Sequence, residues 1–163
     1  SASAGGSVSF TKNNETEQYS TARLSDSRSQ QASLGTNYFL TQKDLLGVSL
    51  SYNYKKARTR YNGLIGRSFQ TSYRRNLPFN QNISLNFSRT GNKYHAADAL
   101  YLSTKVRKDF ISSTSLGLGG PIGGSTWSYA INLNWSDAES NIINYATSGK
   151  TVGLILTKQF SLF

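Results

Sequence analysis

Apolar residues recur at every second position over much of the chain, and the last thirteen residues, TVGLILTKQFSLF, show the pattern clearly. Val152, Leu154 and Leu156 alternate there with residues that are mostly small or polar, Ile155 being an exception. A period of two matches a β-strand, in which successive side chains point to opposite faces of the sheet. The alternation therefore predicts strands with one apolar face each, and it favours an all-β fold.

The same alternation appears in eight segments of the chain. The predicted strands cover residues 1–10, 31–40, 45–55, 63–74, 82–88, 99–108, 126–135 and 151–163. The alternation also runs on from Phe110 to Leu118, so a further hairpin there, or near residues 16–24, would raise the count from eight strands to ten.

Short connections alternate with long ones between these segments. TQKD and NLPFN are short, and the Gly-rich SSTSLGLGGPIGG is treated as a connection of the same set. The connections at 11–30, 56–62, 89–98 and 136–149 are long or polar. In an antiparallel up-and-down β-barrel this order places all long loops at one end, as in transmembrane barrels.

Composition limits the chemistry available to the chain. The 163 residues suit a single domain, 1–163, and no apolar window is long enough for a membrane-spanning helix. Cysteine is absent and His95 is the one histidine, so we expect no disulfide, no metal site, no cofactor and no enzymatic activity. The net charge of +10 favours a negatively charged surface as a partner. Nucleic acid is not expected, because the aromatic residues follow the strand period and do not cluster with the cations.

The polar face of the predicted strands decides between a soluble sheet and a membrane barrel. It consists mainly of serine and asparagine, with few charges. A soluble sheet usually carries charged residues on its wet face, whereas the hollow of a membrane barrel is polar and its outer face is apolar. The pattern therefore predicts a transmembrane β-barrel, with apolar residues toward lipid. The residues predicted to face lipid are Val48, Leu50, Tyr52, Leu85, Phe87, Ile131, Leu133, Leu154 and Leu156.

Aromatic residues lie near the ends of the predicted strands. Trp127 and Trp135 are on the same face, separated by roughly 20 Å along a tilted strand. This spacing is typical of the two aromatic girdles of a membrane barrel. The predicted girdle residues are Tyr54, Tyr73, Trp127, Trp135 and Phe160.

The C-terminal strand, which ends on an aromatic residue, resembles the closing strand of Gram-negative outer-membrane β-barrel proteins. The resemblance implies the bacterial outer membrane as the location and the outer-membrane assembly machinery as a partner. It assigns the assembly signal to Phe160, Leu162 and Phe163. In that family the terminal aromatic shares the apolar phase, whereas Phe163 is one position out of phase.

Basic residues suggest two kinds of contact. Those at the long-loop ends are predicted to contact the phosphates of lipopolysaccharide: Lys55, Lys56, Arg58, Arg60, Arg89 and Lys93. Arg74, Lys105 and Arg107 fall on the polar phase and are predicted lumen cations, with no acid on that phase. Unpaired cations are costly in a packed interior. The lumen is therefore wet, or the chain is part of a larger barrel.

These observations lead to one expected function and two alternatives. The expected function is a non-enzymatic structural, adhesive or assembly component of the outer membrane, in contact with membrane lipid and lipopolysaccharide. The first alternative is a porin-like transport pore or export conduit for anionic solute or polymer, formed with a missing N-terminal domain or a partner subunit. The second is a soluble β-barrel that binds a hydrophobic ligand.

Overall fold

The computed structural model describes residues 2–11, 26–97, 104–123 and 125–159, and these residues form one antiparallel sheet of eight strands. Each strand pairs with its neighbours in the chain, in the order β1 to β8. The strands are β1 Ala2–Thr11, β2 Ser27–Phe39, β3 Asp44–Ala57, β4 Leu64–Asn76, β5 Asn82–Ala97, β6 Val106–Pro121, β7 Trp127–Ser140 and β8 Thr147–Lys158. The prediction of an all-β, up-and-down meander of eight strands is confirmed, and ten strands are not found among the described residues.

The sixth strand lies later in the chain than the sequence pattern predicts. The pattern predicts a strand over residues 99–108 and a connection over 112–124, but β6 covers Val106–Pro121 and so includes most of the Gly-rich segment. Its register against β5 and β7 runs from Asp109 to Gly119 without a break. Hydrogen bonding to two neighbouring strands therefore outweighs the weak strand preference of serine and glycine in this segment.

Several predicted loops are also parts of strands. β5 continues to Ala97 and β7 to Ser140, well beyond their apolar segments. The short 3-10 helices η2 Arg60–Asn62, η3 Pro78–Asn80 and η5 Ile143–Tyr145 lie in the connections. The connections at 40–43, 77–81 and 122–126 are shorter than those at 12–26, 58–63, 98–105 and 141–146, as the alternation predicts. We call the end of the sheet with the short connections the turn end and the end with the long connections the loop end.

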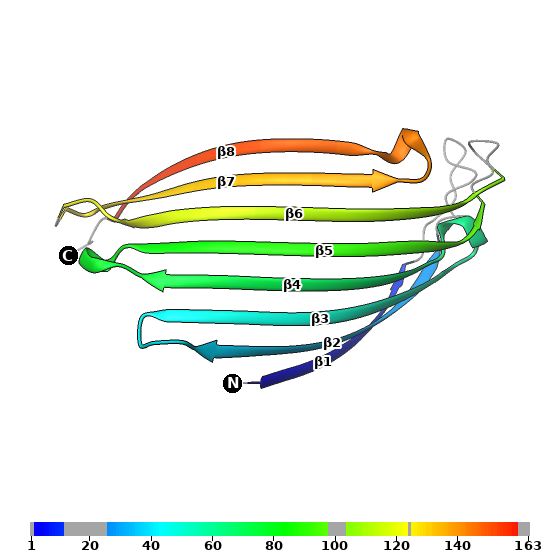
Figure 1. Ribbon diagram of the computed structural model, residues 1–163, viewed down its shortest axis with the longest axis horizontal. Helices are drawn as coiled ribbons and strands as arrows, with labels where there is room; N and C mark the ends of the chain where they lie inside the picture. The colour runs from blue at the N-terminus through cyan, green and yellow to red at the C-terminus, as the bar shows by residue number, and fades with distance from the viewer. Residues whose placement is uncertain (1, 12–25, 98–103, 124, 160–163) are drawn as a thin grey trace.

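The sheet is curved and open along its two edge strands. Figure 1 shows β1 passing behind β2, so that the sheet curls away from the viewer. Among the described residues, β1 pairs only with β2 and β8 pairs only with β7. Closure of the sheet into a barrel is therefore not seen in this chain. No helix in the described part of the chain has the length and apolarity needed to cross a membrane.

The described residues contain no buried hydrophobic side chain, so the sheet encloses no apolar core. The only buried side chains that are polar or charged in this part of the chain are those of Asp44 and Asp109. A soluble sheet of this length would normally bury one face against another layer. Here the hydrogen bonds between strands, and not a packed interior, hold the described residues together.

Candidate functional site

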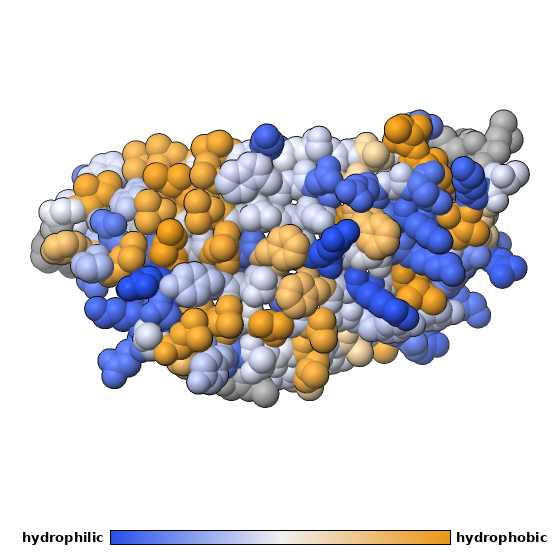
Figure 2. Space-filling view, in the orientation of Figure 1, coloured by the Kyte–Doolittle hydropathy of each residue, from blue (hydrophilic) through white to orange (hydrophobic). Residues whose placement is uncertain are grey.

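The strand register places the predicted apolar positions on one continuous face of the sheet, which we call the apolar face. Leu50 lies opposite Leu34 on one side and Phe69 on the other. Farther along the sheet, Leu133 lies between Leu116 and Val152. Since side chains alternate between faces, register across the seven strand pairs is what places apolar residues of all eight observed strands on one side of the sheet. Figure 1 shows that the sheet curls away from the viewer, and Figure 2, in the same orientation, shows apolar side chains on this near, convex face together with hydrophilic ones.

All nine residues predicted to face lipid lie on the apolar face, and several are strongly exposed. Leu154 is 65% exposed, and Leu50 is 55% exposed. Val48, Ile131 and Leu133 are half-buried by their neighbours in the sheet, and these three residues and Leu50 do not meet in a dry centre. An exposed apolar surface of this extent is typical of a face that meets lipid or another protein.

Four of the five predicted girdle residues also lie on the apolar face. The Tyr73 hydroxyl donates a hydrogen bond to Asp44 at the turn end, and the Lys158 ammonium lies 5.5 Å from the Trp127 ring centroid. Tyr54 contacts the ring of His95, and Trp135 is 39% exposed. Phe79 is a further exposed aromatic residue at the turn end, and the strand pattern does not identify it because it lies in the connection that contains η3. Phe160, with the predicted assembly signal at Leu162 and Phe163, lies outside the described residues.

The opposite face, which we call the polar face, is satisfied by its own short side chains. Hydroxyl and amide groups form hydrogen bonds between neighbouring strands, such as Ser88 with Ser113 at 2.7 Å and Asn86 with Ser115 at 3.2 Å. Glycines make room for them: a methyl group at Gly117 would come within 2.6 Å of the Ser84 hydroxyl. This face is therefore a mainly hydrophilic lining on the concave side of the sheet, and Ile111 and Ile155 are exposed apolar exceptions.

Among the described residues, the polar face carries one charged cluster, at the loop end. Arg107 forms an ion pair with Asp109 at 2.6 Å, and its Nε donates to both carboxylate oxygens at 3.0 and 2.7 Å. The guanidinium also lies over the rings of Tyr94 and Tyr145, 4.5 and 3.3 Å from their centroids. We call Tyr94, Arg107, Asp109 and Tyr145 the Arg107 cluster. The cluster joins β5, β6 and η5.

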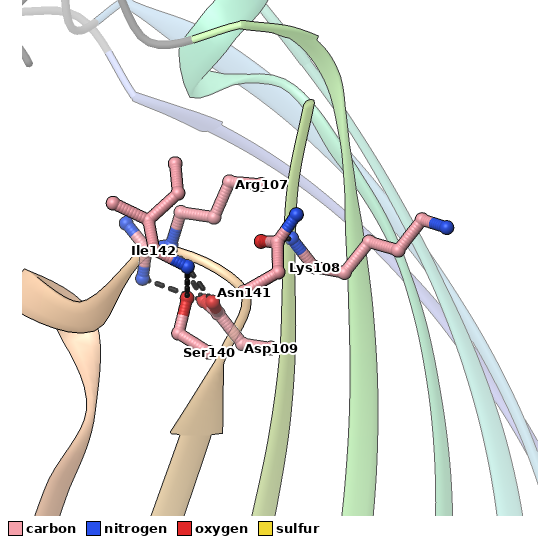
Figure 3. Close-up of polar contacts among 6 residues, drawn as sticks. All are labelled: Arg107, Lys108, Asp109, Ser140, Asn141 and Ile142. Atoms are coloured by element: carbon pink, nitrogen blue, oxygen red, sulfur yellow. Dashed lines mark hydrogen bonds and ion pairs between the residues drawn. The ribbon is translucent and has the colours of Figure 1, made fainter. Parts of the chain in front are cut away.

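Neighbouring contacts fix the loop that carries Tyr145. The amide of Lys108 donates to the Asn141 side chain at 2.7 Å, and the Asn141 side chain donates to the carbonyl of Val106 at 2.9 Å. Figure 3 shows these residues, with Lys108 pointing away from Arg107 and Asp109. The connection at 141–146 is thereby held against the start of β6.

The cluster corrects one prediction about lumen cations. The sequence pattern places no acid on the polar phase, but Asp109 lies on that face and neutralises Arg107. The error follows from the misplaced sixth strand, which is predicted to end at residue 108. Arg74 lies on the polar face and is exposed, while Lys105 precedes β6 and is not part of a strand.

The predicted lipopolysaccharide contacts divide between the two faces and the connection at 58–63. Lys55 lies on the polar face and Lys56 on the apolar face, while Arg58 and Arg60 are in the connection. Two more are expected in a loop but belong to β5, on the apolar face: Arg89 and Lys93. Two further cations near Arg89 and Lys93 on this face, Arg67 on β4 and Lys108 on β6, are not among the predicted lipopolysaccharide contacts. Arg67 is in phase with Ile65 and Phe69 in the sequence, which is the signal that identifies it.

The cations of β4, β5 and β6 line a groove on the apolar face that extends from the middle of these strands toward the loop end. The groove has a volume of about 800 Å³. Arg67, Arg89, Lys93 and Lys108 line it, together with an aromatic floor of Phe69, Phe87 and Phe110. We call it the basic groove. Figure 2 shows hydrophilic side chains among apolar ones toward this end of the sheet.

The described residues offer no arrangement that suggests catalysis or metal binding. The His95 side chain contacts the Tyr54 ring, and the structure gives it no hydrogen bond to a serine in the part of the chain that it describes. No group of three or more histidine, cysteine, aspartate or glutamate side chains that could hold a metal occurs among these residues.

Comparison with known proteins gives no family for the chain. No family model matches the chain, and no curated protein or solved structure matches it either. The functional argument therefore depends on the surface of the sheet itself.

Proposed function

We propose that this chain is a membrane-embedded β-sheet of the bacterial outer membrane. It acts as a non-enzymatic structural component, and its loop end contacts lipopolysaccharide. The observation that carries the proposal is the exposed apolar face, interrupted by charged residues on β4 to β7, in a sheet whose described residues bury no hydrophobic side chain. Lipid is the solvent that stabilises such a face, because burial of apolar surface is favourable at about 25 cal/mol per Å². The polar face would then line the interior, as in membrane barrels.

The alternative of a soluble barrel requires the same apolar residues to face inward. The apolar face is instead the convex face, and Val152, Leu154 and Leu156 on β8 are more than half exposed. The aromatic residues near the strand ends also support lipid contact, because tyrosine and tryptophan favour the membrane interface.

Fluorescence quenching by brominated lipid tests this orientation. In vesicles whose acyl chains carry bromine, we expect strong quenching of Trp135 in the full chain with Trp127→Phe, because Trp135 lies on the apolar face. The matched control replaces both tryptophans by phenylalanine and places one at Asn132→Trp, on the polar face of the same strand. Equal quenching at the two positions, or a chain that stays in water as a folded monomer, would contradict the proposal.

A second candidate function is the wall of a larger pore, and the open edges favour it. The backbone groups on the outer sides of β1 and β8 have no strand partner among the described residues. In a bilayer each unsatisfied backbone group costs several kcal/mol, so these edges must pair with each other or with further strands. Further strands would make a wider barrel with room for a channel.

Single-channel recording distinguishes the two arrangements. The full chain in a planar bilayer is expected to pass no steady current if β1 pairs with β8, because an eight-stranded barrel is filled by side chains. A stable conductance would show that strands from further segments or from other copies complete a wider ring. Because the chain has no cysteine, cysteines introduced in pairs on β1 and β8 can report edge pairing by disulfide formation.

A further inference from the structure

We propose that the basic groove binds the phosphate groups of one acylated, phosphomonoester-bearing lipid, while its acyl chains lie on the apolar face. The inference is based on the proposed function and specifies the site and the chemical group that would be recognised. It differs from the sequence prediction, which places the lipopolysaccharide contacts mainly in loops and includes Lys55 on the other face.

The first argument is the arrangement of charge. Lys93 and Lys108 lie directly opposite each other across β5 and β6, on the same face. Like charges directly opposed in a sheet are destabilising. Arg89 lies on the same face of β5, and Arg67 on β4 faces Gly91 across the strand pair. Four cations around one groove therefore provide a site for a multiply charged anion.

The second argument is that no carboxylate among the described residues forms an ion pair with these four cations. Asp137 and Glu139 on β7 belong to the apolar face, but none of the four cations forms an ion pair with them or with any other carboxylate in the described part of the chain. The Arg107 cluster shows the contrast, since on the polar face a cation does have its carboxylate. The charge of the basic groove is thus left for a ligand.

The third argument is the floor of the groove, which selects a lipid over another anion. The Arg89 guanidinium lies 5.7 Å from the ring centroid of Phe110. Leu50, Ile65 and Phe69 also line the groove and continue into the apolar face. A ligand that fits both parts has an anionic head and apolar chains. A nucleic acid or a free phosphate would leave the apolar lining in contact with water.

The charge count favours a phosphomonoester over the phosphodiester of ordinary phospholipids. A monoester phosphate carries a charge of about −1.5 to −2 at pH 7, with three acceptor oxygens. Arginine and lysine donate charge-assisted hydrogen bonds to such oxygens, and arginine often does so through two nitrogens. Four cations match one or two monoester groups and exceed what one singly charged diester needs.

The test measures lipid binding to the full chain reconstituted in phosphatidylcholine nanodiscs. Labelled lipid A, which bears phosphomonoesters, is titrated against the wild-type chain and against the double variant Arg89→Gln/Lys108→Gln. Each cation near an anionic lipid surface contributes about 1 kcal/mol, so we expect the double variant to bind about 30-fold more weakly. The matched control Arg74→Gln removes an exposed basic residue of the polar face, outside the basic groove, and it should bind like the wild type.

Each outcome decides one part of the inference. Equal binding of lipid A by the wild type and the double variant would show that the basic groove is not the binding site. Equal affinity for lipid A and for phosphatidylglycerol would overturn the monoester preference. Brominated-lipid quenching of Trp135 in the same nanodiscs separates these results from failure of the proposed function, because a chain that is not embedded shows no quenching at all.

Discussion

Replacing Asp109 by alanine is expected to lower the free energy of unfolding by about 3 kcal/mol, at the lower end of the range for breaking a buried ion pair. Asp109 is 4% exposed, and it accepts two hydrogen bonds from Arg107 Nε in addition to the ion pair. Its removal leaves a guanidinium that is one-fifth exposed without the carboxylate that neutralises it. Urea titration of the chain in lipid vesicles, followed by tryptophan fluorescence, measures the change.

The matched control is the second ion pair in the described part of the chain. Arg75 lies 3.7 Å from Asp44 and is 52% exposed, so Arg75→Ala is expected to change the unfolding midpoint little. Loss of stability of similar size in both variants would show that the burial of Asp109 is not what makes the Arg107 cluster important.

Placing a charge in the middle of the apolar face is expected to have a comparable effect. The substitution Leu133→Lys should lower the free energy of unfolding in the membrane by about 2–4 kcal/mol, which is the cost of a basic residue near the bilayer midplane. The adjacent Asn132 points to the polar face, so Asn132→Lys should cost less than Leu133→Lys. Unfolding of both variants in vesicles gives the comparison.

The difference between these neighbouring positions is the informative result. If Asn132→Lys proves as damaging as Leu133→Lys, then both faces of β7 are enclosed in apolar surroundings, and the orientation proposed for the sheet is wrong. If neither variant is damaging, the apolar face does not reach the bilayer centre.

Much of the fold could be predicted from the sequence, because alternation is a local property. Val48 and Leu50, or Ile131 and Leu133, mark the phase of their strands without knowledge of the neighbours. The positions of the strand ends were harder to predict. Residues 89–97 carry cations and polar groups, and they extend β5 because β6 offers hydrogen-bond partners up to Ala97. Only the pairing reveals this part of the strand.

The candidate site was predictable only in part for the same reason. Arg89 and Lys93 are predicted as phosphate-binding residues, but in a loop, so their shared face with Lys108 could not be inferred. The basic groove depends on register between β4, β5 and β6, and one residue of slippage would move Arg67 to the other face. The Arg107 cluster likewise joins residues far apart in the sequence, from Tyr94 to Tyr145.

The meander order also affects how the sheet can form. Each strand finds its partner in the next segment of the chain, so every hairpin closes over a short stretch of sequence. Closing short loops costs little conformational entropy, and folds rich in nearby contacts form faster than those that join distant segments. The sheet can therefore grow by one hairpin at a time from either side, and each added strand becomes the template for the next.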